Sequence, residues 1–430
     1  MTMESQKDLS CAPKKRGIPL PLLAALALLL TLSLLIYLRE FRYDYSDFRI
    51  HAFIAADFNF ADLHTITSRL SYPLWHLCVS VLYKIGLPLA WAASSVSAIF
   101  KGLTLLLCYG ILNQITHKKL KPWLLTLASV ALVLVTGLCL PWFNPTVYRS
   151  TGSPIGSPNV WHNPTQQAVT VAMLLCVPYL VHCWHEFERL QPTLGKRAML
   201  PWRKVLMLAF LLMLSLACKP TFMQALLPAA FVMFLVEWIR HKQNWRYFGQ
   251  IILAFLPAAA YFLLQYLYYT GVVVEYTSGV SIGITLESMT VAVRNALLQC
   301  AFPLLALVCC YRKGMFKDRL LVLAVLMLAF SVLEAMAFRE TGLRQGHGNF
   351  TWATNSSAFF LWVVMLGVYM NTLREDFARS TQGIQPVAVT MRRIGYGACI
   401  GYGACALLLL WHVASGVYYL IYLFTTQNAF

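Results

Sequence analysis

The feature that most limits what this chain can fold into is a series of long apolar runs without a charged residue. Ile18–Leu38 and Ile251–Tyr269 are two such runs. A helix needs about 20 residues of this kind to cross the ~30 Å hydrocarbon core of a membrane. The runs are continuous instead of alternating, which excludes a transmembrane β-barrel. The sequence therefore predicts an all-α, polytopic membrane protein.

Composition excludes a large soluble part. Hydrophobic residues make up 59% of the 430 positions and charged residues only 12%, against about 25% charged in a soluble domain. No polar stretch exceeds about 35 residues, and the smallest domains need about 50. We therefore expect a single transmembrane domain over 1–430, with no separate soluble domain.

The net charge of +17 is distributed as in the loops of a membrane protein, so nucleic-acid binding is not expected. An N-terminal basic group and five basic loops hold 23 of the 34 Lys and Arg residues, and the positive-inside rule places them in the cytoplasm. The other segments hold 8 Lys and Arg against 8 Asp and Glu, and are expected outside: 39–72, 141–165, the Lys219-Pro220 turn, 271–292 and 339–352. This pattern predicts about eleven helices (10–13) in the plasma (cell inner) membrane, with the N-terminus cytoplasmic.

Residues 72–116 are long enough for two crossings, although the charge pattern requires an odd number. Either Pro73–Leu89 is a half-membrane helix or Lys118–Lys121 is an external turn. The first alternative gives eleven crossings and is preferred.

The first outer loop, 39–72, is expected to contain an amphipathic helix at the membrane surface. Asp44, Asp47 and His51 have the spacing i, i+3, i+7, which predicts one helix face. A carboxylate beside a His could act as a general base or hold a cation. The alternative is a solvated helix whose acids pair with Arg42 and Arg49.

The next two outer segments contain a helix start and an isolated lysine. Asn163 suits a helix cap and Pro164 the first turn, so Trp161 and His162 are expected at the mouth of the following helix. The alternative is simple capping with an interfacial Trp. Lys219 lies on the side that otherwise avoids positive charge, where it could bind phosphate or extend to the membrane surface.

The last outer loop, 339–352, is rich in glycines and hydrogen-bond donors. Two arginines beside glycines suggest a phosphate or pyrophosphate clamp. The candidate residues are Arg339, Glu340, Arg344, His347 and Asn349. The alternative is an ordinary polar hairpin.

Together these features resemble the GT-C superfamily of integral-membrane glycosyltransferases. The resemblance covers most of the chain, but its motifs are short: DFRIHAFIA at 47–55, Tyr72-Pro73-Leu74 and Lys219-Pro220-Thr221. It implies a GT-C-like fold and transfer of a sugar from a polyprenyl-phosphate carrier to a glycan, lipid or protein acceptor on the outer face of the membrane. The Asp-Glu pair typical of protein mannosyltransferases is replaced by Asp44-Tyr45-Ser46-Asp47.

The resemblance implies that Asp47 or Asp44 is the base, and His51 is the expected helper. The remaining candidates would hold the phosphate or line the sugar pocket: Trp161, His162, Asn163, Lys219, Arg339, Glu340, Arg344, His347 and Asn349. Asp44, Asp47 and His51 also offer three ligands to Mg²⁺ or Mn²⁺ but lack a fourth, so the sequence leaves a divalent cation open without assigning a metal site. Charged residues within the predicted spans are few and mostly near their ends, which argues against a path through the membrane.

Three alternatives stay open at this point. The closest is a lipid-linked polysaccharide polymerase or ligase, which acts on lipid-pyrophosphate glycans. The second is a membrane O-acyltransferase, for which the His-rich segment 182–185 would be the candidate. The third is a transporter of lipid-linked glycans, which is not an enzyme.

Overall fold

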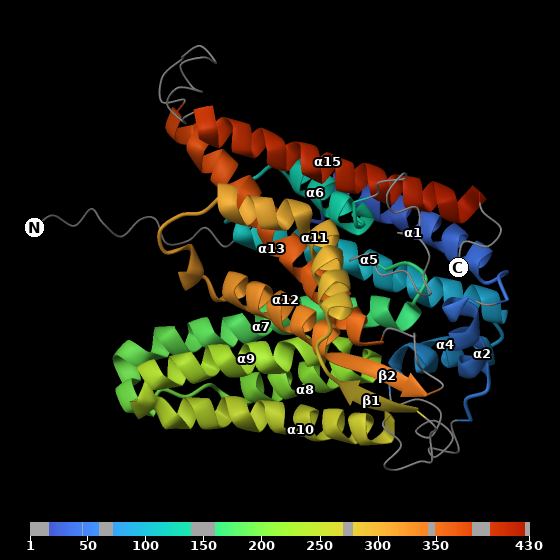
Figure 1. Cartoon of the computed structure of the whole chain (residues 1–430), viewed down its shortest axis with the longest axis horizontal. Helices are drawn as coiled ribbons and strands as arrows, with labels where there is room; N and C mark the ends of the chain where they lie inside the picture. Colours follow the sequence, from blue (N-terminus) through green and yellow to red (C-terminus); the bar gives the residue numbers. More distant parts are fainter. Residues whose placement is uncertain are drawn as a thin grey trace, which may run out of the picture.

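The structure is a computed structural model that describes residues 17–44, 46–59, 72–138, 160–269, 278–342, 349–380 and 396–425. These residues form thirteen α-helices, arranged mostly as a bundle with long helices side by side (Figure 1). The helices are α1 (Leu20–Glu40), α2 (Asp47–Ala56), α4 (Leu74–Lys84), α5 (Leu89–Ile115), α6 (Pro122–Leu134), α7 (Pro164–Leu194), α8 (Trp202–Cys218), α9 (Thr221–Arg240), α10 (Trp245–Tyr269), α11 (Leu286–Cys309), α12 (Arg319–Ala337), α13 (Trp352–Ser380) and α15 (Tyr396–Thr425). The predicted helical, polytopic architecture is confirmed.

Nine of the described helices are long and apolar enough to cross a membrane. The predicted number of about eleven is not established, because α8 has only 17 residues and α6 only 13. Helix α4 has 11 residues, which extend about 16 Å at 1.5 Å per residue. It is too short to cross, whereas α5 with 27 residues is long enough, so this region has the lengths expected for a half-membrane helix followed by one crossing.

Two helices form the centre of the bundle. In α7 and α13, 72% and 78% of the apolar window is buried inside the protein, more than in any other described candidate span. Their interior faces carry small and aromatic side chains, including Trp184 on α7 and Trp362 on α13. Both helices begin at the same end of the bundle, since Gln166 in the first turn of α7 donates to Ser356 near the start of α13.

Helix α11 is bent in its middle. Cys300 leaves the helical conformation (φ −117°, ψ 20°), and Pro303 follows it inside the helix. A proline lacks the N–H that would bond the carbonyl four residues earlier, here that of Gln299. The indole Nε1 of Trp362 donates to this carbonyl at 2.7 Å and satisfies it. Figure 1 shows the consequence, because the first part of α11 runs steeply across the direction of its neighbours.

One feature corrects the prediction of a purely helical chain. β1 (Ser278–Ile282) and β2 (Phe338–Gly342) pair antiparallel, with Val280 opposite Glu340. They lie in two of the segments predicted to be outer loops, and the pairing satisfies backbone groups that a loop would leave to water. Each strand has only five residues, too few to show a clear alternation in the sequence.

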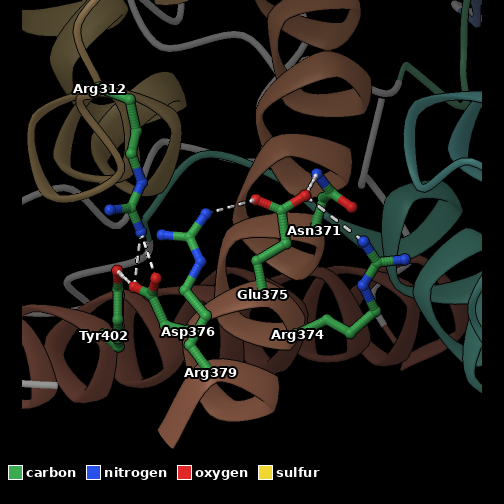
Figure 2. A network of polar contacts seen from close by, with 7 residues as sticks. All are labelled: Arg312, Asn371, Arg374, Glu375, Asp376, Arg379 and Tyr402. Atoms are coloured by element: carbon green, nitrogen blue, oxygen red, sulfur yellow. Dashed lines mark hydrogen bonds and ion pairs between the residues drawn. The ribbon is translucent and has the colours of Figure 1, made fainter. Parts of the chain in front are cut away.

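At the opposite end of the bundle, a polar network joins Arg312, which follows α11, to α13 and α15 (Figure 2). Arg312 donates to both oxygens of Asp376, at 2.5 and 2.6 Å, and the Tyr402 hydroxyl donates to the same carboxylate at 2.6 Å. This carboxylate therefore ties the end of α11 to α13 and α15. The neighbouring carboxylate, Glu375, has three partners: Asn371, Arg374 and Arg379.

Candidate functional site

The candidate site begins with Asp47, the first residue of α2. Ser46 caps this helix, because its hydroxyl accepts from the Phe48 N–H at 3.1 Å and donates to Glu40 at 3.0 Å. The cap fixes where the helix starts, and with it the position of Asp47. A carboxylate in the first turn is also favoured by the partial positive charge at a helix N-terminus.

Asn163 connects Asp47 to Lys219. Its Oδ1 accepts three hydrogen bonds: from the Thr165 hydroxyl at 2.8 Å, the Gln166 N–H at 3.0 Å and the Lys219 Nζ at 3.3 Å. These donors fix the orientation of the amide, so its Nδ2 donates to Asp47 Oδ2 at 3.2 Å. The predicted cap at Asn163 is confirmed, with Pro164 in the first turn.

Lys219 does not extend to the membrane surface, as one alternative had it. The residue is extended (φ −175°, ψ 142°) between α8 and α9, and it is only 5% exposed. Its Nζ lies 4.2 Å from the centre of the Trp352 ring, at the start of α13. The ring face attracts the ammonium, which keeps the cation in the interior close to Asn163.

His162 stands beside this pair with no partner of its own among the described residues. Both ring nitrogens are buried and make no hydrogen bond, although its ring centre lies 5.6 Å from that of Trp352. Buried polar atoms are nearly always satisfied in native proteins. The His162 imidazole, next to a carboxylate and an ammonium, therefore has two ring nitrogens that no described residue satisfies.

The site lies where three helices begin. The Thr221 hydroxyl in α9 donates to Gln166 Oε1 at 3.1 Å, and Gln166 Nε2 donates to Ser356 at 2.6 Å. Gln166 thus locks the N-termini of α7, α9 and α13 together, and helix N-termini attract anions. The sequence analysis missed Gln166 and Ser356, and it quoted Thr221 only as part of the Lys219-Pro220-Thr221 motif; the one signal for Gln166 was a glutamine pair at the start of an apolar helix.

His51, one turn after Asp47 on α2, is paired with a residue that the sequence analysis also missed. Its Nδ1 lies 2.9 Å from Nε2 of His76 on α4. A single histidine in the short apolar helix α4 gave no sequence pattern from which its contact with His51 could be predicted. The pair holds the ring of His51 against α4.

The charges of the site influence one another. Burial alone would raise the pKa of Asp47, but His162, His51 and Lys219 together with the Asn163 hydrogen bond lower it below its ordinary value. Burial lowers the pKa of Lys219 to about 7, with Asp47 opposing that shift. Burial likewise lowers the pKa of both His51 and His162 to about 4. At neutral pH the site therefore holds an ionised carboxylate, neutral imidazoles and a lysine close to its titration point.

Trp161 does not line an open pocket, contrary to prediction. It is 2% exposed and packs between Tyr37 and Lys101, whose Nζ lies 4.2 Å from its ring centre. Lys101 Nζ also donates to the Val160 carbonyl at 2.8 Å. Lys101 lies in the middle of α5, so it is an exception to the expectation that charged residues lie mostly near the ends of the spans.

Several predicted residues do not join the cluster. Asp44 precedes α2 and therefore does not share a helix face with Asp47; it is exposed and pairs with Arg49. This is the alternative considered for the acids of this loop, and it holds for Asp44 alone. Arg339 on β2 donates instead to the Thr285 hydroxyl, and the neighbouring Glu340 is buried.

Three further candidates cannot be assigned to the cluster. Arg344 and His347 lie outside the described residues. Asn349 begins the short 3₁₀ helix η5 (Asn349–Thr351), just before α13.

Among the described residues, no group of three or more His, Cys, Asp or Glu side chains could hold a metal ion. No protein-family model matches the chain, and no curated protein matches it.

Proposed function

We propose that the chain is a membrane glycosyltransferase that moves a sugar from a polyprenyl-phosphate carrier to an acceptor hydroxyl on the outer face of the plasma membrane. One observation carries the proposal. Two hydrogen bonds through Asn163 link the Asp47 carboxylate to the Lys219 ammonium at one end of the helical bundle, beside His162, which has no partner among the described residues. Such a transfer needs a base for the acceptor and a positive charge for the departing phosphate.

Asp47 is the base in this mechanism. Among the described residues only its Oδ2 receives a hydrogen bond, which leaves Oδ1 for the acceptor hydroxyl. The acceptor oxygen forms a bond to the anomeric carbon while its proton passes to Asp47. The bond from that carbon to the phosphate oxygen breaks, and the phosphate leaves with the electron pair.

Lys219 and His162 receive the phosphate. The departing group gains a negative charge when a diester becomes a monoester, and a protonated lysine in a buried site stabilises that charge more than one in water. A bound phosphate also favours the protonated form of Lys219, whose pKa is near neutral. The neutral ring of His162 can donate a hydrogen bond to a phosphate or a sugar oxygen.

The test uses the purified chain in detergent with labelled polyprenyl-phosphate sugars. We expect release of free polyprenyl phosphate, reduced by about 10²-fold or more in Asp47→Asn because general-base catalysis contributes that much. The matched control is Asp44→Asn, three residues away, exposed and outside the cluster, which should retain full activity.

Two results would reject the mechanism. Equal activity in Asp47→Asn would remove Asp47 as the base. Absence of release from every monophosphate donor, with turnover of a lipid-pyrophosphate glycan, would instead indicate a polymerase or ligase.

A further inference from the structure

Lys101 lies in the middle of a candidate membrane span and has no place in the mechanism described above. It is about 20 Å from either end of α5, and it is 1% exposed. A cation inside a span is costly, and such residues usually pair with other charges or with backbone carbonyls and have a function. The contacts that Lys101 makes identify this function.

Lys101 holds the segment that leads into α7. Its Nζ donates to the Val160 carbonyl at 2.8 Å and lies 4.2 Å from the centre of the Trp161 ring. The Trp161 carbonyl accepts a hydrogen bond from the Gln167 side chain. Lys101 and Gln167 thus fix two consecutive carbonyl groups, and the next two residues along the chain belong to the candidate site.

A second buried acidic residue holds the other half of the site. Glu40 is the last residue of α1 and is fully buried. Its Oε1 accepts from the Ser46 hydroxyl at 3.0 Å. Since Ser46 is the N-cap of α2 and Asp47 is the first residue of that helix, Glu40 fixes the point from which the Asp47 side chain projects.

Glu40 and Lys101 belong to helices that pack side by side, α1 and α5 (Figure 1). Their side chains interact electrostatically. Tyr37, one turn before Glu40, contacts both halves of the site, because its ring stacks on Phe48 of α2 at 5.2 Å and lies 6.1 Å from the Trp161 ring. Helices α1 and α5 therefore form a common support for the start of α2 and for the segment before α7.

We propose that Lys101 and Glu40 are positioning residues for the transfer reaction, a role that rests on the function proposed above. Lys101 sets the positions of His162 and Asn163, and Glu40 sets that of Asp47. The Asn163 Nδ2 donates to Asp47 at 3.2 Å, and this bond forms only when both segments are held in the right relative position. A misplacement of about 1 Å at a reacting group costs up to about 10²-fold in rate, so a costly buried lysine is retained for its effect on geometry.

The first test measures kcat, KM and Tm in Lys101→Met. Methionine keeps the length of the side chain but cannot donate to the Val160 carbonyl. We expect kcat to fall by about 10- to 100-fold, because the base and the phosphate ligands are misplaced, and KM to change little. The double variant Glu40→Gln/Lys101→Met removes both buried charges, which is often neutral or stabilising. Its Tm should equal or exceed that of the unaltered chain while kcat stays low, whereas a role confined to stability would restore kcat together with the Tm.

Two substitutions test the part assigned to Glu40. Glu40→Gln keeps a side-chain oxygen that can accept from Ser46, so it should retain most of the kcat. Glu40→Leu removes that acceptor and should lower kcat as Lys101→Met does. Equal kcat in the two variants would overturn the role of Glu40.

Gln250 on α10 provides a matched control, because it also holds a backbone segment from a buried position. It accepts from the Leu200 N–H at 2.8 Å and donates to the Leu200 carbonyl at 2.9 Å. Leu200 precedes α8, whose other end leads to Lys219, so this contact is at the end of the bundle away from the site. Gln250→Leu should lower the Tm and leave the kcat of the folded protein unchanged.

A spectroscopic readout tests the positions without any turnover. The chain has ten histidines, and in protein labelled with ¹⁵N-histidine the ring signals of His162 are identified by their loss in His162→Asn. These signals should shift in Lys101→Met, because the ring moves relative to its charged neighbours. The signals of His241, which follows α9 at the opposite end of the bundle, should stay where they are.

Two results would overturn the role of Lys101. One is an undiminished kcat in Lys101→Met, and the other is a set of His162 signals that coincide with those of the unaltered chain. If the unaltered chain releases no polyprenyl phosphate, the proposed function fails, but the His162 signals still decide whether Lys101 positions that residue. The two failures are therefore distinguishable.

Discussion

Replacing Lys219 by methionine should make the protein more stable at neutral pH. The lysine is 5% exposed, and its burial lowers its pKa from the ordinary 10.5 to about 7. Between these two values the unfolded chain binds more protons at this position than the folded chain does. The stability contributed by this residue therefore rises with pH across that window, and at pH 7 its burial opposes folding.

The magnitude follows from the two pKa values. At pH 7 the lysine is about half protonated in the folded chain and fully protonated in the unfolded chain. This difference lowers the free energy of unfolding by about 4 kcal/mol. At pH 9 the difference falls to about 2 kcal/mol. Methionine is close to lysine in length and carries no charge, so Lys219→Met should recover most of these amounts.

Thermal unfolding of the purified chain in detergent measures the effect. The Tm of Lys219→Met should exceed that of the unaltered chain at pH 7, and the difference should shrink by about half at pH 9. Lys196→Met, at an exposed lysine in the short helix η2 (Gly195–Arg197), is the control and should show neither change. A lower Tm for Lys219→Met at pH 7, or a difference independent of pH, would refute this account of Lys219.

Three other predictions concern single positions. In the proposed reaction kcat/KM should fall as the pH rises, with an apparent pKa of about 7. Lys219→Arg should abolish that fall, because a guanidinium stays charged. A Lys219→Arg variant with the same pH profile as the unaltered chain would contradict the role of Lys219. Asp376→Asn should destabilise by about 1–2 kcal/mol, measured by Tm, because one partly exposed carboxylate loses its arginine and tyrosine partners; an unchanged Tm would mean that the network adds nothing. Gly416→Ala should destabilise by about 1–3 kcal/mol, because a Cβ there would lie 1.6 Å from the Leu134 carbonyl oxygen. Gly403→Ala in the same helix meets nothing within 4 Å and should stabilise by about 0.5–1 kcal/mol; equal effects of the two would show that α15 does not pack closely on α6.

Local signals in the sequence were enough for the helices and for parts of the site. Continuous apolar runs predicted the helical, polytopic architecture, and Asn163 followed by Pro164 predicted the helix start at Asn163. Asp47 and Lys219 were selected because each is unusual for its surroundings. Each of these inferences uses residues that are close together in the sequence, and local structure of this kind depends little on tertiary packing.

The parts that could not be predicted depend on contacts between distant positions. The strand pairing joins residues about 60 positions apart, so its partner cannot be found from five residues of local pattern. The unpredicted partnership between His51 and His76 is likewise visible only after α2 packs on α4. The prediction that Asp44 shares a helix face with Asp47 was wrong because α2 begins only after Ser46, its N-cap. A spacing of three residues places two side chains on one face only when both residues belong to the helix.

The order in which the site residues emerge during synthesis follows from how the site is assembled. Asp47 is made about 170 residues before the lysine that Asn163 links to it. At a translation rate of about 5–20 residues per second, that interval lasts roughly 10–35 s. During it, the early helices carry a carboxylate without its ammonium. The nascent chain therefore reaches its final arrangement only once the turn between α8 and α9 has been inserted, and truncation before that turn should leave a fragment that quality-control proteases degrade.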